Sequence, residues 1–70
     1  MKTSRQLEIE MDLRSRHKGM MNISEIAEEL GLTNRQITAE FVEGLPSYLV
    51  GHRRKWRIAD IARRLADYET

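Results

Sequence analysis

The stretch of sequence that decides the fold is MNISEIAEELGLTNRQI, residues 21–37. It holds two helix-start signals of the same kind: Asn22 precedes Glu25 by three residues, and Thr33 precedes Gln36 by three. Each pair predicts a capping box. In this motif the first side chain accepts a hydrogen bond from a backbone N–H inside the helix. The second side chain accepts a hydrogen bond from the backbone N–H of the capping residue. The stretch therefore predicts two helices in close succession.

Glycine and proline indicate where both helices end. Gly31 can adopt the left-handed conformation that commonly ends a helix, so the first helix should cover about residues 23–30. The second should run over about 34–43 and stop at Gly44, because Pro46 cannot continue a helix. Two helices joined by so short a turn predict a helix-turn-helix unit.

The start of the second helix carries the candidate base contacts. Ile37 and Phe41 are four residues apart and are expected to face the core. Polar side chains then face outward; they are Thr33, Asn34, Arg35, Gln36 and Thr38. Asparagine and glutamine amides can hydrogen-bond to adenine, and an arginine guanidinium can hydrogen-bond to guanine. Threonine can contact a thymine methyl group or a phosphate. Gln36 has a competing role, because its capping box would hold it at the backbone.

Two short β-prone segments, 48–50 and 55–58, flank residues 51–54 and predict a β-hairpin with a loop of three or four residues. Side chains alternate along a strand, so Trp56 should anchor the hairpin to the core rather than stack on a base. The hairpin is strongly basic, and residues 44–59 contain no acid. We expect its candidate phosphate contacts to be His52, Arg53, Arg54, Lys55 and Arg57.

The two ends of the chain are both expected to be helical. A last helix is predicted from Asp60 to about Tyr68, with the acid near its positive end. We interpret residues 21–70 as a DNA-binding winged helix-turn-helix domain and residues 1–20 as an N-terminal helical extension. The expected fold class is mainly α with a small β-hairpin, built from three to four helices and a two-stranded wing.

Residues 7–14 alternate between apolar and polar, as in a strand, but good helix formers dominate and favour a helix. That helix would place Leu7 and Met11 on one side and Ile9 and Leu13 nearly opposite. It would then pack on the domain with one side and on a second copy or a partner protein with the other. The alternative is a helix that is only loosely attached.

Composition excludes several classes of function. Seventy residues make one small domain, and the absence of cysteine excludes disulfides and thiolate metal sites. No apolar run suits a membrane span or a signal peptide, so we expect a cytoplasmic protein with no membrane partner. Two histidines without a serine or cysteine partner, and no glycine-rich phosphate loop, indicate no enzyme. We therefore expect no catalytic residue, no bound metal and no cofactor.

Charge is unevenly distributed along the chain. The net charge of +1 divides into +2 over residues 1–20, −4 over 21–50 and +3 over 51–70. Such asymmetry predicts a polyanion partner for one region, and the basic hairpin beside a helix-turn-helix favours double-stranded DNA.

Three segments together, 23–33, 44–46 and 50–61, resemble the excisionase/MerR-like winged-helix superfamily over residues 21–68. The resemblance implies a small phage-type or prophage-type protein that binds duplex DNA sequence-specifically, as an excisionase in DNA recombination or as a transcriptional regulator. It also implies that the second helix of the motif enters the major groove and that the wing follows the backbone or minor groove. One departure is Ala59, where the pattern usually has a serine or threonine cap.

By the same resemblance, the groove-reading role falls to Asn34, Arg35 and Thr38, and the wing role falls to Arg53, Arg54 and Lys55. Two alternatives stay open. One is the DNA-binding domain of a phage terminase small subunit. The other is a winged-helix module that binds proteins and not DNA.

Overall fold

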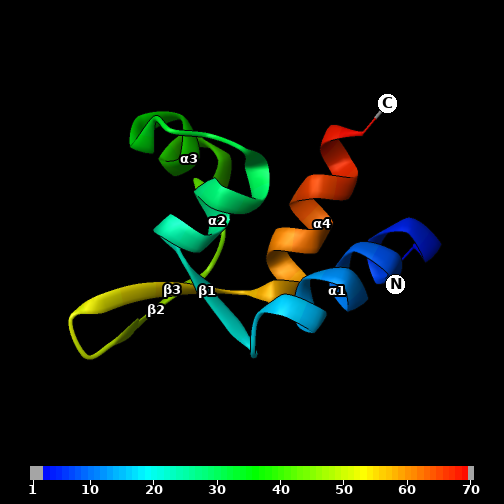
Figure 1. Ribbon diagram of the computed structural model, residues 1–70, viewed down its shortest axis with the longest axis horizontal. Helices are drawn as coiled ribbons and strands as arrows, with labels where there is room; N and C mark the ends of the chain where they lie inside the picture. Colours follow the sequence, from blue (N-terminus) through cyan, green and yellow to red (C-terminus); the bar gives the residue numbers. More distant parts are fainter. Residues whose placement is uncertain (1–2, 70) are drawn as a thin grey trace.

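A computed structural model describes residues 3–69 as four helices and a three-stranded antiparallel sheet (Figure 1). In chain order the elements are α1 (Ser4–Arg16), β1 (Met20–Asn22), α2 (Ile23–Leu30), α3 (Arg35–Val42), β2 (Ser47–Val50), β3 (Arg53–Arg57) and α4 (Ile58–Tyr68). The prediction of a mainly α fold with a small β component is confirmed. The expected two-stranded wing is wrong in one respect, because β1 adds a third strand.

Helix α2 begins and ends as the sequence predicts. The Asn22 side chain accepts from the Glu25 backbone N–H at 2.9 Å, and the Glu25 carboxylate accepts from the Asn22 N–H at 2.9 Å. This closes the first capping box. At the other end Gly31 has φ 70°, a left-handed conformation that a residue with a side chain adopts only at a cost. The chain can therefore turn sharply into α3, which packs on α2.

The hairpin is tighter than expected. Strand β2 ends at Val50 and β3 begins at Arg53, so the turn is Gly51-His52 and not the predicted three or four residues. Strand β1 pairs with the other side of β3, which gives the sheet order β1-β3-β2. Met21 of β1 lies opposite Trp56 of β3, and both side chains are buried. A three-residue strand is too short to show a periodic pattern, which is why the sequence did not reveal it.

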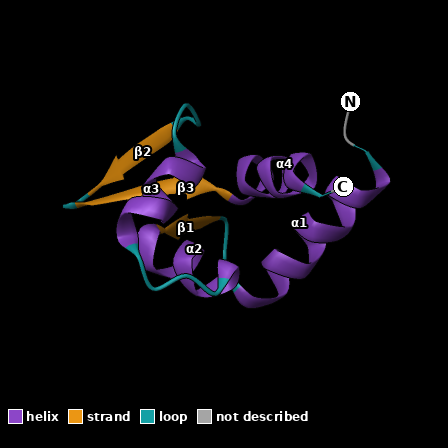
Figure 2. Ribbon diagram, turned by 90° about the horizontal axis from the view of Figure 1, so that it is seen from above, coloured by secondary structure: helices purple, strands orange, loops and turns teal. Residues whose placement is uncertain are grey.

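Helix α1 is a firmly packed part of the domain. It lies along α4 in both views of the molecule (Figures 1 and 2), and this is the most extensive packing between any two of the described elements. Ile9 and Leu13 are in the core, whereas Leu7 and Met11 on the opposite side are exposed. The predicted packing of one side on the domain is confirmed, and the loosely attached alternative is wrong. Contact of the other side with a second copy or a partner protein stays a prediction. The helices run antiparallel. At one end Arg5 Nε binds Glu69 Oε2 at 2.7 Å, and at the other the Ile58 N–H donates to the Gly19 carbonyl oxygen at 3.3 Å.

Helix α3 is fixed at its C-terminal end by α4. Arg64 of α4 donates through Nη1 to the carbonyl oxygens of Phe41 and Glu43, at 3.0 and 3.1 Å. These carbonyls lie at the end of α3, where a helix leaves its acceptors without backbone partners. Helix α4 itself begins at Ile58, earlier than predicted, and has no side-chain hydrogen bond at its N-cap. Trp56, predicted to anchor the hairpin, is buried in the shared core as expected.

The capping box of α2 gives the first testable prediction. Replacing Asn22 with alanine removes the acceptor for the Glu25 N–H and should lower the free energy of unfolding by about 1 kcal/mol. Asn22→Ser keeps an acceptor and should recover most of that loss. Urea unfolding of the three proteins measures both effects. An Asn22→Ala protein as stable as the original would contradict the assigned role of this cap.

Candidate nucleic-acid interface

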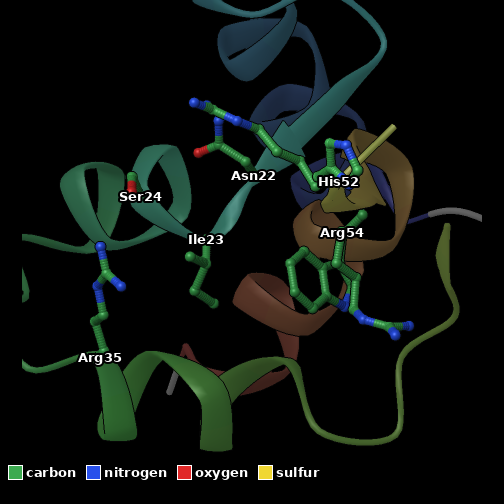
Figure 3. Close-up of a pocket in the computed structure, with 8 residues that line it drawn as sticks. Asn22, Ile23, Ser24, Arg35, His52 and Arg54 are labelled. Atoms are coloured by element: carbon green, nitrogen blue, oxygen red, sulfur yellow. The ribbon is translucent and has the colours of Figure 1, made fainter. Parts of the chain in front are cut away.

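A cleft of about 370 Å³ lies where the start of α2, the start of α3 and the hairpin turn meet. Figure 3 shows Arg35 rising from the start of α3 beside Ser24, with His52 and Arg54 of the hairpin on the other side. The lining residues are Asn22, Ile23, Ser24, Arg35, His52, Arg53, Arg54 and Trp56. The start of α3 and the basic hairpin turn therefore line the same cleft.

The cleft is cationic because its arginines have no carboxylate partners. Among residues 3–69, ion pairs neutralise the cations of α1 and one arginine of α4, but none involves Arg35, Arg53 or Arg54. All three arginines are exposed. Arg54 donates through Nη1 to the Ser47 hydroxyl at 2.8 Å, a neutral partner that steers the side chain without cancelling its charge. The surface can therefore accept phosphate groups.

The cap of α3 differs from the predicted one. Asn34, not Thr33, is the N-cap, and its side chain accepts from the Gln36 N–H at 2.8 Å. The predicted Thr33–Gln36 capping box is therefore wrong. Asparagine competes well with threonine for this position, and moving the cap by one residue shifts the start of the helix. As a consequence the Asn34 oxygen is occupied, whereas the Gln36 side chain is exposed and free of a capping role.

Thr38 is not an outward-facing residue. Its side chain is fully buried, at 0% exposure, and its hydroxyl donates to the Asn34 carbonyl oxygen at 3.2 Å. Ile37, predicted to be in the core, is 47% exposed. A threonine hydroxyl that binds a carbonyl one turn earlier leaves no unsatisfied polar atom, so it can replace an apolar residue on the buried face. Thr38 therefore cannot contact a base or phosphate from this position.

The predicted wing cations fall on two faces of the sheet. Because side chains alternate along β3, Lys55 and Arg57 lie on the face opposite Trp56, as expected, and neither lines the cleft. Arg57 is exposed, and Lys55 is half-buried opposite Asn22 of β1. By the same alternation Arg54 lies on the face of Trp56, whereas Arg53 lies on the face of Lys55 and Arg57. The hairpin residues that line the cleft with α3 are His52, Arg53 and Arg54.

Sequence reasoning missed the contribution of α2 to the cleft. Asn22, Ile23 and Ser24 line it, and Ser24 is exposed beside Arg35 (Figure 3). Their position just before and within the first turn of α2 was evident from the capping box. That the hairpin would lie against this turn was not evident, because it follows from the pairing of β1 with β3.

An acidic pair on α2 binds the end of α1, away from the cleft. His17, which directly follows α1, is mostly buried, with Nδ1 3.2 Å from Glu25 Oε2 and Nε2 3.1 Å from Glu29 Oε1. The Asn22 backbone N–H chiefly lowers the pKa of the Glu25 carboxyl, and His17 lowers it further. The Arg16 guanidinium chiefly lowers the pKa of the Glu29 carboxyl, again with help from His17. These contacts tie α1 to α2.

Comparisons with protein-family models, curated proteins and solved structures found no match for this chain. Functional inference therefore depends on the chain's own geometry. In the part of the chain that the structure describes, no group of three or more histidine, cysteine or acidic residues could hold a metal ion. Nor does any described helix have both the length and the apolar character needed to cross a bilayer.

The lowered pKa values of Glu25 and Glu29 predict acid sensitivity. A carboxyl whose pKa is lowered by folding stabilises the protein above its ordinary value, 4.5 here, and loses that effect as the pH falls through the folded-state value. The free energy of unfolding should therefore decrease on acidification from neutral pH to about pH 3. Urea unfolding of the original protein and of Glu29→Gln at both pH values measures this, and the variant should show the smaller decrease. Equal decreases would contradict the role given to Glu29.

Proposed function

We propose that this protein binds double-stranded DNA sequence-specifically as a small winged helix-turn-helix protein, acting as an excisionase or transcriptional regulator of the phage or prophage type. The observation that carries the proposal is the cleft that is lined by Arg35 of α3 on one side and by His52, Arg53 and Arg54 of the hairpin on the other. These groups come from separate segments, and their arginines are exposed without carboxylate partners in the described range. A phosphate backbone is the partner that such a surface suits.

The order of elements supports the winged-helix interpretation. A helix and a short strand precede the α2–α3 pair, and a hairpin follows it; β1 is an edge strand of the sheet and pairs with β3. Figure 1 places the hairpin beside α2 and α3 on the side of the molecule away from the termini. In the proposed complex α3 enters the major groove by its N-terminal half, and the hairpin follows the adjacent backbone and minor groove.

The exposed side chains of α3 limit how it can read DNA. Arg35 and Gln36 are exposed at the start of α3, and in the proposed complex Arg35 would contact guanine and Gln36 would contact adenine. Glu40 and Glu43 are exposed farther along the helix and would repel phosphates, so the N-terminal half is the reading part. Asn34 keeps only its amide N–H₂ for a base while its oxygen caps the helix.

A second candidate function is a module that binds another protein. It is favoured by an apolar groove of about 360 Å³ between the α2–α3 turn, α3 and α4. Exposed Ile37 and Tyr68 contribute to it, and Phe41 forms its floor together with leucine side chains. This groove is separate from the cationic cleft and has no residue in common with it. The two functions can therefore be tested independently.

The DNA-binding proposal predicts a specific dependence on salt. Fluorescence anisotropy of a labelled duplex, measured at several salt concentrations, should show affinity that falls steeply as salt rises. Arg53→Ala and Arg54→Ala should each reduce the slope of log K against log salt by about 0.9, since each removes one phosphate contact. Arg63→Ala is the matched control, because Arg63 is exposed on α4 and does not line the cleft.

The same titration separates the proposal from its rival. No duplex binding at low salt would overturn the DNA-binding function and leave the protein-interaction module as the better interpretation. A control variant that reduces the slope as much as Arg53→Ala would overturn the assignment to this cleft. In-vitro selection of bound duplexes from a random pool then gives the recognised sequence.

Base readout gives a separate prediction. On the selected duplex, Gln36→Ala should weaken binding by about tenfold and relax preference at one base pair, because one good base contact contributes about 1–3 kcal/mol of discrimination. Thr38→Val, which keeps the buried shape and removes the hydroxyl, should leave both affinity and preference unchanged. Selection repeated with each variant measures the preference. Relaxed preference in Thr38→Val alone would contradict the assignment.

A further inference from the structure

The three-stranded sheet has one face that the helices leave open. Met21 of β1 and Trp56 of β3 lie opposite each other and are both buried, so the face that they share is turned toward the core. In Figure 1, α2 and α3 lie on one side of the hairpin, and no described helix covers its other side. Because side chains alternate along a strand, the residues next to the buried pair point to this uncovered side, which we call the outer face.

The register of the three strands identifies the side chains of the outer face. Lys55 of the middle strand pairs with Asn22 on β1 and with Tyr48 on β2, and paired residues share a face. Alternation then adds the residues two positions away on each strand. The outer face is made up of Met20, Asn22, Tyr48, Val50, Arg53, Lys55 and Arg57.

Three cations stand in a row along the middle of the outer face. Arg53, Lys55 and Arg57 are alternate residues of β3, so their side chains leave the strand about 6.7 Å apart. Arg53 and Arg57 are exposed, and Lys55 is half-buried. None of the three forms an ion pair with another residue of the range 3–69. Successive phosphates of an extended single strand have a comparable spacing, so this row matches a strand that lies along β3.

The outer face carries no acid that could neutralise the row. Residues 20–22 and 47–57 contain no carboxylate. Lys55 does influence Glu25 of α2, whose pKa is lowered chiefly by the Asn22 backbone N–H and least by Lys55. That carboxylate already contacts the Asn22 N–H and the His17 ring. A second copy of the chain would bring three more cations to this face, so charge complementarity favours a polyanion.

An exposed aromatic side chain lies beside the row of cations. Tyr48 is 40% exposed and lies opposite Lys55 on the outer face. Nucleic-acid bases stack on exposed aromatic rings, and such stacking tolerates any sequence because every base has a π-face. A duplex keeps its bases stacked inside, so Tyr48 would meet only sugars and phosphates there. A ring beside a row of cations therefore suits a single strand better than a second duplex.

We propose that the outer face binds single-stranded DNA, with one base stacked on Tyr48 and successive phosphates bound by the row of cations. This goes beyond the proposed duplex binding, which uses the cleft. Asn22 and Arg53 belong to both surfaces, because they stand on the outer face and also line the cleft. A strand that leaves a duplex in the cleft can therefore continue onto the outer face. The choice of DNA over RNA rests on the proposed function.

The test is fluorescence anisotropy of the full chain with a labelled oligothymidylate of about 8 nucleotides, which forms no duplex and suits one small binding face. Tyr48→Ala should lower its affinity about tenfold at an unchanged salt slope, because a stacked base is lost and no phosphate contact is. Tyr48→Phe keeps the ring and should bind as the original protein does. Arg57→Ala should reduce the slope of log K against log salt by about 0.7, the value per phosphate of a single strand.

Each variant has a matched control outside the outer face. Leu49→Ala shortens an exposed side chain of the same strand that points to the opposite face, and Arg63→Ala removes an exposed arginine of α4. Both should bind oligothymidylate as the original protein does. Arg35→Ala is measured on oligothymidylate and on a labelled duplex. It should lower only the duplex affinity, whereas Tyr48→Ala should lower only the oligothymidylate affinity, because Arg35 lines the cleft and Tyr48 does not.

The outcomes separate the single-strand site from the proposed function. No oligothymidylate binding at low salt would overturn the site, whatever the duplex does. Equal affinities of Tyr48→Ala and Leu49→Ala would also overturn it, as would an equal loss in Arg35→Ala, since the single strand would then lie in the cleft. Tighter binding of an oligouridylate of the same length would assign the outer face to RNA and overturn the choice of DNA. Binding of oligothymidylate without any binding of duplex would support the site and overturn only the proposed function.

Discussion

The pairing of Met21 with Trp56 holds the basic hairpin against the start of the helix-turn-helix unit. Both side chains are buried, and the pair lies in the middle of the β1–β3 ladder. The residue after Met21 is Asn22, whose capping box begins α2, so the strand and the helix share one fixed point. The distance between hairpin and helices therefore depends on three residues of β1. The position of the hairpin beside the start of α2 follows from that constraint.

The distribution of paired and unpaired charge gives the cleft its chemical character. Acids of α1 and α2 are bound to arginines and to His17, and these contacts stabilise the packing of α1 on the rest of the domain. The arginines of the cleft take no part in them. Each of these surface ion pairs adds little stability, so their main effect is to neutralise the charges of α1 and α2. The net charge of the chain is only +1, although the cleft itself is cationic.

Sequence patterns were sufficient where local chemistry decides the structure. The Asn22 cap, the end of α2 at Gly31, the two-sided α1 and the burial of Trp56 all depend on signals within a few residues. Prediction failed where two local choices were nearly equal in free energy. Asn34 displaced Thr33 as the cap of α3, and Thr38 replaced Ile37 on the buried face because its hydroxyl found a carbonyl. Strand β1 depends on a distant partner, which no short-range pattern could indicate.

We propose that Arg35, Arg53 and Arg54 bind the nucleic acid jointly. Titration of the isotope-labelled protein with a short duplex, followed by NMR of the arginine Nε–Hε resonances, tests this most directly. We expect the resonances of these three arginines to shift or broaden, while those of Arg14 and Arg63 stay in place. Shifts confined to Arg14 and Arg63, with the cleft arginines unchanged, would contradict it.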